Sequence, residues 1–95
     1  MLDAATVGKI EKSFLCSTLD DLEAELRSLK NINEVDEFGQ TPLILAILNQ
    51  NISAVRLLIS KGANASIVDN NGLTAKHYAQ LSGNFEIQNL IQVKV

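Results

Sequence analysis

DEFGQTPLILAILNQN, residues 36–51, recurs in altered form as DNNGLTAKHYAQLSGN, residues 69–84. The two stretches begin 33 residues apart, and the same offset continues to give matches further downstream. The identical pairs are Asp36/Asp69, Gly39/Gly72, Thr41/Thr74, Ala46/Ala79, Leu48/Leu81, Asn51/Asn84 and Leu57/Leu90. Identity at one fixed spacing indicates an internal repeat, so we predict a chain built from structural units of about 33 residues.

Each unit is predicted to contain a turn followed by a short helix. Asp36 and Gly39 stand at the first and fourth positions of a β-turn pattern. Thr41 is expected to cap the helix, with Pro42 at the first helical position, where a missing N–H loses no partner. The apolar face of this helix would consist of Leu43, Ala46 and Ile47.

A second helix is predicted to complete the unit. Gln50-Asn51 interrupts the first helix, and Gly83-Asn84 does the same in the next copy. Lys61-Gly62 ends the second helix, because glycine suits the position just after a helix. Val55, Leu58 and Ile59 share one face of it.

The flanking copies are predicted to be caps. The first would hold a helix from about Thr6 to Cys16 and a second helix capped by Ser17 or Thr18. Their apolar positions are Val7, Ile10 and Phe14, then Leu19, Leu22, Leu26 and Leu29. In the last copy Gln80, Gln88 and Gln92 replace Ile47, Val55 and Ile59, as a terminal repeat requires. We therefore expect one domain over residues 1–95, with an N-terminal cap (1–30), a full repeat (31–63) and a C-terminal cap (64–95).

The repeat resembles the ankyrin family. Thr41–Ala46 matches four of the five defined positions of the family's T-P-L-H-x-A core, and Thr74–Ala79 matches three. Leu57-Leu58 with Lys61–Asn64 resembles its LLxxGAD segment, and Gly83–Ile87 resembles its GHxEI segment. The tetratricopeptide repeat has a similar period, but its aromatic and glycine pattern is absent. The resemblance implies an all-α solenoid of helix pairs with projecting hairpin fingers, and a protein that binds other proteins.

Composition narrows the function classes. The net charge of −3 disfavours a nucleic-acid-binding protein, which needs a basic face. The longest apolar run, Leu43–Leu48, is too short to span a membrane, and the N-terminus lacks the pattern of a signal peptide. A single cysteine favours a reducing compartment. We therefore expect a monomer in the cytoplasm, or in a host cytoplasm if the protein is a secreted effector, with no cofactor and no metal.

Seven of the eleven acidic residues lie within residues 20–37. They form either a solvated outer face or an acidic end that attracts a basic partner. The seven are Asp20, Asp21, Glu23, Glu25, Glu34, Asp36 and Glu37.

Catalysis is not expected. Cys16 and His77 are the sole thiol and the sole imidazole, but they belong to the first and third copies. Packed helices lie roughly 8–10 Å apart, so a nucleophilic pair would be separated by something like 20 Å. The resemblance implies that His77 forms hydrogen bonds within and between repeats.

Partner-binding positions are carried over from the family, at the finger tips and at the ends of the first helices. They are Glu37, Phe38, Gln40, Asn70, Asn71 and Leu73 on the fingers, and Leu15, Cys16, Leu48, Asn49, Leu81 and Ser82 on the helices. Leu15, Leu48 and Leu81 recur at the 33-residue offset. These leucines either complete the core or form an apolar stripe for a partner's helix or loop, and the stripe is the hypothesis carried forward.

Four functions compete. The leading one is a non-catalytic binding module that acts as an adaptor, a scaffold or an inhibitory subunit. The initial Met1 and the acidic cap favour this stand-alone module. The alternatives are a structural fragment of a longer ankyrin array, or a small bacterial effector or immunity-type protein that neutralises an enzyme. An enzyme with an unrecognised site is the remaining possibility.

Overall fold

The computed structural model describes residues 2–16, 23–24, 26–27, 29 and 31–92, without the side chains of residues 13–16 and 92. Within this part of the chain five helices have defined bounds, and there is no strand. The helices are α1 (Ala4–Cys16), α3 (Pro42–Leu48), α4 (Ile52–Ser60), α5 (Ala75–Ser82) and α6 (Phe85–Gln92). Residues 23, 24, 26 and 27 are also helical. The predicted all-α class is confirmed.

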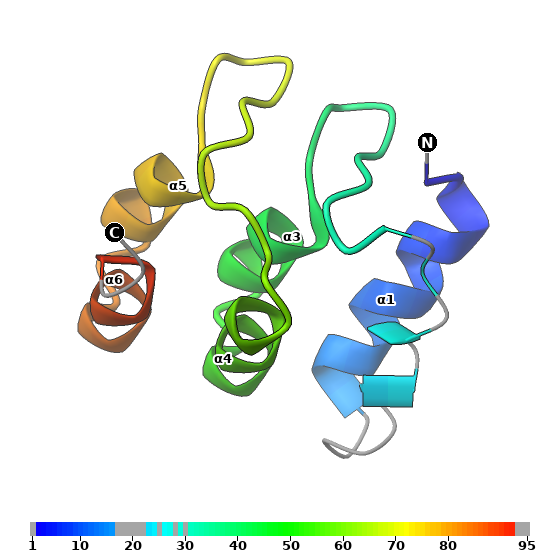
Figure 1. Cartoon of the computed structure of the whole chain (residues 1–95), viewed down its shortest axis with the longest axis horizontal. Helices are drawn as coiled ribbons and strands as arrows, with labels where there is room; N and C mark the ends of the chain where they lie inside the picture. Colours follow the sequence, from blue (N-terminus) through cyan, green and yellow to red (C-terminus); the bar gives the residue numbers. More distant parts are fainter. Residues whose placement is uncertain (1, 17–22, 25, 28, 30, 93–95) are drawn as a thin grey trace.

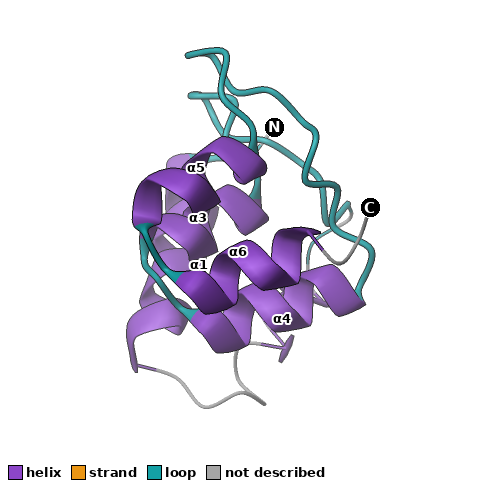
Figure 2. Cartoon of the chain, turned by 90° about the vertical axis from the view of Figure 1, so that its left-hand side faces the viewer, coloured by secondary structure: helices purple, strands orange, loops and turns teal. Residues whose placement is uncertain are grey.

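The helices form two layers with loops projecting from one side. Helix α3 packs between α1 and α5, while α4 packs against α6 in the second layer (Figure 1). Two long loops, which we call the fingers, stand side by side above α3 and α5 (Figure 1). Figure 2 shows the short α3–α4 and α5–α6 loops running side by side along one edge, which we call the loop edge. This repetition of helix pairs confirms the predicted solenoid.

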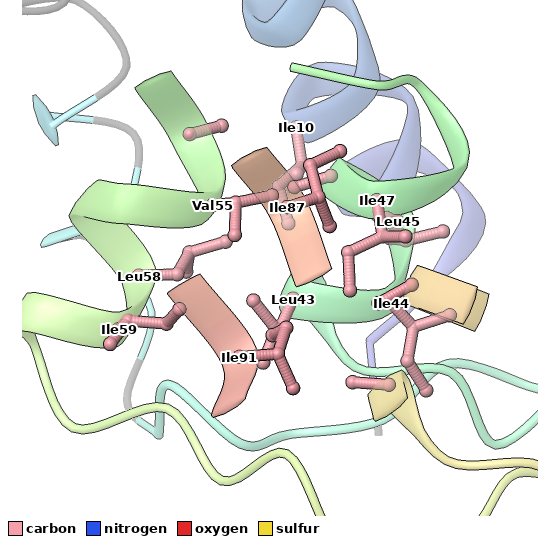
Figure 3. Packing of buried hydrophobic residues seen from close by; sticks show 14 of the residues in the cluster. Ile10, Leu43, Ile44, Leu45, Ile47, Val55, Leu58, Ile59, Ile87 and Ile91 are labelled. Atoms are coloured by element: carbon pink, nitrogen blue, oxygen red, sulfur yellow. The ribbon is translucent and has the colours of Figure 1, made fainter. Parts of the chain in front are cut away.

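The core is aliphatic and lies between the two layers. Val55, Leu58 and Ile59 of α4 are buried, as the repeat pattern predicts. Side chains from α1, α3, α4 and α6 point into the common interior, among them Ile10, Leu43, Ile87 and Ile91 (Figure 3). In the first copy Leu26 is buried and Leu29 is half-buried, whereas Phe14, Leu19 and Leu22 lie outside the described side chains.

The predicted helix boundaries of the full repeat are confirmed by its caps. The Thr41 side chain accepts a hydrogen bond from the Ile44 amide, and Pro42 occupies the first turn of α3. Asn51 caps α4 by accepting from the Ala54 amide. At the other end of α4, Gly62 adopts φ +88° and its amide donates to the Ile59 carbonyl. This is the glycine-terminated helix end that the sequence predicts.

Gln50 follows α3 and adopts the left-handed backbone conformation, which glycine adopts more readily than other residues. Its φ is +53°, and it is the one non-glycine residue with positive φ in the described part of the chain. Its amide donates to the Ile47 carbonyl, and the Asn51 amide donates to Ala46, which together complete the helix-ending motif. The equivalent residue of the last copy is Gly83, with φ +69°.

Helix α1 starts at Ala4, two residues before the predicted start at Thr6. The Asp3 carboxylate accepts a hydrogen bond of 2.8 Å from the Thr6 amide and caps the helix. The Leu2 amide donates to the Val35 carbonyl and attaches the N-terminus to the base of the first finger. Aligning the repeats could not reveal the earlier start of α1. At the 33-residue offset, residues 4 and 5 correspond to residues 37 and 38, which belong to the first finger and are not helical.

Candidate protein-binding surface

Leu48 and Leu81 occupy equivalent positions, at the C-terminal ends of α3 and α5. Leu48 is 50% exposed and Leu81 is 73% exposed, so both lie on the surface rather than in the core. The side chain of Leu15, the third member of the predicted stripe, lies outside the described residues. The structure thus places two of the three predicted leucines on the loop edge.

Two further apolar residues extend this surface. Phe85, the first residue of α6, is 77% exposed, and its equivalent Ile52 in α4 is half-buried. The sequence interpretation missed Phe85, although the same 33-residue offset relates it to Ile52. Leu48, Ile52, Leu81 and Phe85 together define what we call the apolar loop edge.

The polar helix-end candidates bond to their own helices. The side-chain amide of Asn49 donates to the Leu45 carbonyl at 2.8 Å. The Ser82 hydroxyl donates to the Ala79 carbonyl at 2.7 Å. Both residues are half-buried, so they contribute less free polar surface to the loop edge than their positions predict.

The first finger exposes an aromatic side chain. Phe38 is 60% exposed, and its neighbour Glu37 is also exposed. The Asp36 carboxylate accepts hydrogen bonds of 2.9 Å from the amides of Phe38 and Gln40 and holds the turn closed. Phe38 is therefore presented on a fixed turn rather than on a free loop.

The second finger contains the same type of turn and contacts the first finger through hydrogen bonds. The Asp69 carboxylate accepts from the amides of Asn71 and Leu73. The side-chain amide of Asn70 donates to the Glu37 carbonyl at 3.0 Å and so connects the two fingers. Asn70 and Asn71 are exposed, whereas the candidate Leu73 is half-buried.

Asp69 and Tyr78 form a polar pair at the base of the second finger. Burial alone would raise the pKa of the Asp69 carboxyl, but the hydrogen bonds donated by the Tyr78 hydroxyl and by the Leu73 and Asn71 amides outweigh burial and lower that pKa. The bond to Asp69, with burial, raises the pKa of the Tyr78 phenol. Gln40 lowers both pKa values and is half-buried, which places this finger candidate beside the pair.

The acidic residues of the 20–37 segment do not share one environment. Glu23 accepts from Arg27 at 2.9 Å and lies 3.6 Å from the Lys61 ammonium, so it is part of a local ion-pair cluster. Asp36 is buried in the first finger, and Glu37 is exposed on that finger. Asp20, Asp21 and Glu25 lie outside the described residues.

His77 has a structural role in the last copy. Its Nδ1 accepts from the Thr74 amide at 3.2 Å while the Thr74 hydroxyl accepts from the His77 amide, which makes a capping box for α5. This confirms the expected hydrogen bond within the repeat. The Cys16 side chain lies outside the described residues, and α3 separates α1 from α5 (Figure 1).

The comparison with known families agrees with this geometry. A family model described as ankyrin repeats in three copies matches residues 9–93. The chain belongs to the ankyrin-repeat family. Ankyrin repeats generally mediate protein–protein interaction and are generally non-catalytic.

Relatives of this ankyrin chain include a human ion channel and viral ankyrin repeat proteins. It is 38% identical over 80 residues to the human transient receptor potential cation channel subfamily A member 1, covering 84% of this chain and 6% of that protein. It is 33% identical over 90 residues to the cowpox virus ankyrin repeat domain-containing protein OPG023, covering 94% of this chain and 14% of the relative. A mimivirus putative ankyrin repeat protein, L92, is 40% identical over 62 residues, covering 64% of this chain and 15% of the relative. The ankyrin chain thus corresponds to a small part of each relative.

Two negative findings concern the described residues of this ankyrin chain. No helix among them is both long and apolar enough to cross a lipid bilayer. No three His, Cys, Asp or Glu side chains among them are grouped so that they could hold a metal ion.

Proposed function

We propose that the chain is a non-catalytic ankyrin module that acts as an adaptor, a scaffold or an inhibitory subunit, and that it binds a partner protein through its exposed apolar side chains. The observation that carries this proposal is the pair Leu48 and Leu81, which are 50% and 73% exposed at equivalent positions. An exposed leucine recurs at the ends of two successive first helices, and the first residue of α6, Phe85, is exposed as well; grouped apolar exposure of this kind favours a binding surface.

The binding residues follow from this proposal. The apolar loop edge would contact a helix or loop of the partner, and Phe38 with Glu37 and Asn71 would contact it from the fingers. Three other finger residues would mainly hold the fingers in place and contact the partner less, namely Asn70, Gln40 and Leu73. The module would work as a monomer in the cytoplasm, where the thiol of Cys16 stays reduced. Light scattering of the purified chain and fractionation of the native cells test these two points.

A structural fragment of a longer array is the second candidate. The chain spans only 6% to 15% of the three relatives described above, which favours a piece of a larger repeat protein as the working unit. In that case the face of α5 and α6 would pack on a following repeat, and the isolated chain would self-associate through it. A monomer in solution contradicts this candidate. Neutralisation of a partner enzyme by an effector or immunity-type protein would use the same surfaces as the module.

The experiment compares partner capture by matched variants. The tagged wild-type chain and a Leu48→Asp, Leu81→Asp double variant are used as baits in an extract of the native cells, followed by mass spectrometry. Val68→Asp is the matched control, because Val68 is also apolar and 56% exposed but is not one of the proposed contact residues. The proposal predicts a protein captured by the wild type and by Val68→Asp and lost with the double variant. Equal capture by all three baits would overturn the assignment of the loop edge.

A further inference from the structure

A hollow of about 450 Å³ lies between α1 and the first finger. Helix α1 lines it with Ala4, Val7, Gly8 and Glu11, whose i, i+3, i+4, i+7 spacing places them on one helix face. The finger contributes Asp36, Glu37 and Phe38. Figure 1 shows α1 and the first finger adjacent at the N-terminal end of the stack. The hollow is separate from the apolar loop edge.

The floor of the hollow is apolar and open. Val7 is half-buried, buried Leu2 lies beside it, and Phe38, 60% exposed, forms a wall. Gly8 also lines the hollow, and a Cβ added there would meet nothing within 4 Å. Glycine inside a helix costs about 1 kcal/mol relative to alanine. The absence of a side chain at Gly8 leaves room in the hollow, and it lowers the stability of helix α1 by about that amount.

The rim of the hollow is acidic. Four of its lining residues carry carboxylates, namely Asp3, Glu11, Asp36 and Glu37. Lysine and arginine are absent from the described residues that line it, and Lys9 and Lys12 of α1 are not part of the lining. A cationic group in the hollow would therefore meet negative charge from both α1 and the finger.

We propose that this hollow binds an extended segment of a partner protein that carries an arginine next to an aliphatic residue. The guanidinium would stack on the Phe38 ring and pair with the carboxylates, and the aliphatic side chain would occupy the space above Gly8 and Val7. The volume is at the small end of the roughly 300–1,000 Å³ typical of binding sites, which suits a few extended residues better than a helix about 10 Å across. The proposal adds a second contact site to the binding module and does not depend on the loop edge.

The test uses a defined peptide. Acetyl-Arg-Leu-Arg-Leu-Arg-Leu-amide is titrated into the isotope-labelled full chain, and backbone amide shifts are followed by NMR. The expected result is saturable shifts at Val7, Gly8 and Phe38. The affinity should fall as the salt is raised from about 20 mM to about 150 mM, because exposed charge pairs are screened. Shifts confined to the loop edge would overturn the proposal while leaving the proposed function intact.

Matched variants and peptides sharpen the test. Glu11→Gln with Glu37→Gln should weaken binding at least about four-fold, since each exposed ion pair is worth roughly a factor of two to five. Glu86→Gln, which removes an exposed carboxylate of α6, should leave binding unchanged. Gly8→Leu should abolish binding with an intact helical signal, because leucine is a good helix former that fills the hollow. Wild-type affinity in Gly8→Leu, or equal affinity for a peptide with glutamate or lysine in place of arginine, would overturn the proposal.

Discussion

Gly39 and Asn70 approach so closely that a Cβ on Gly39 would lie 2.9 Å from the backbone nitrogen of Asn70. The same backbone nitrogen donates a hydrogen bond of 3.0 Å to the carbonyl of Phe38. The contact between the two fingers therefore depends on the absence of a side chain at Gly39. Because Phe38 is the aromatic group that the first finger exposes, this contact also fixes a candidate binding residue.

The first prediction compares alanine at Gly39 with alanine at Gly72. Both glycines have nearly the same positive φ, +77° and +79°, but a Cβ on Gly72 would meet nothing within 4 Å. Gly72→Ala should cost roughly 1 kcal/mol from the left-handed conformation alone. Gly39→Ala should cost about 2 kcal/mol more, because it also forces the fingers apart. Urea unfolding followed by circular dichroism measures both, and equal costs would contradict the finger contact.

The second prediction concerns Gln50. Replacing it with glycine should raise the free energy of unfolding by roughly 0.5–1 kcal/mol, because glycine adopts its φ of +53° without steric strain. The reciprocal change Gly83→Gln, at the equivalent helix end, should lower it by a similar amount. Thermal and urea unfolding report both values. A destabilised Gln50→Gly variant would show that the Gln50 side chain has a role beyond the turn.

The third prediction concerns Gly8. Gly8→Ala should stabilise the protein by roughly 0.5–1 kcal/mol, since the new methyl group improves helix propensity and meets no neighbour within 4 Å. Amide hydrogen exchange along α1 should slow in parallel. Loss of stability would mean that the space beside Gly8 is occupied in the folded protein, which would also remove the basis of the proposed hollow.

The fourth prediction is a pH dependence from Asp69 and Tyr78. The lowered pKa of Asp69 gives stability that is present above the ordinary aspartate value of 3.8 and is lost as the pH falls through the lower folded pKa. The raised pKa of Tyr78 gives stability that is complete below 10.0 and is lost as the pH rises through the higher folded pKa.

Tyr78→Phe tests this pair. It should cost about 1–2 kcal/mol at neutral pH, because the Asp69 carboxylate loses a hydrogen-bond donor. The variant should also lose less stability than the wild type at both pH extremes. Urea midpoints measured from well below pH 3.8 to well above pH 10.0 report this dependence. Parallel curves for the two proteins would contradict the assigned coupling.

The repeat pattern predicted the full repeat well because its determinants are local. Thr41 and Gly62 act within a few residues of the helix ends that they form, so their identities are sufficient. Asp3 was missed as a cap because the 33-residue offset relates it to Asp36 and Asp69, which close the finger turns instead of capping a helix. The positive φ of Gln50 was missed because glutamine is not typical of the left-handed conformation. Only the equivalent residue of the last copy, Gly83, indicates it.

The candidate site was less predictable because it depends on packing between units. The sequence placed Leu48 and Leu81 at equivalent positions but left open whether neighbouring helices cover them. Gln40 was expected at a free finger tip, yet the approach of the second finger half-buries it beside Asp69. The hollow was not foreseen, although the spacing of Val7, Gly8 and Glu11 marks one face of α1.

The most direct test of the central claim compares aspartate at two adjacent residues of α3. Ile47 is 1% exposed and Leu48 is 50% exposed, so one belongs to the core and the other to the exposed surface that we propose binds the partner. Urea unfolding of Leu48→Asp should give a free energy within about 1 kcal/mol of the wild type, while Ile47→Asp should fail to fold. If Leu48→Asp also unfolds the protein, the leucine belongs to the core and the apolar loop edge is not a binding surface.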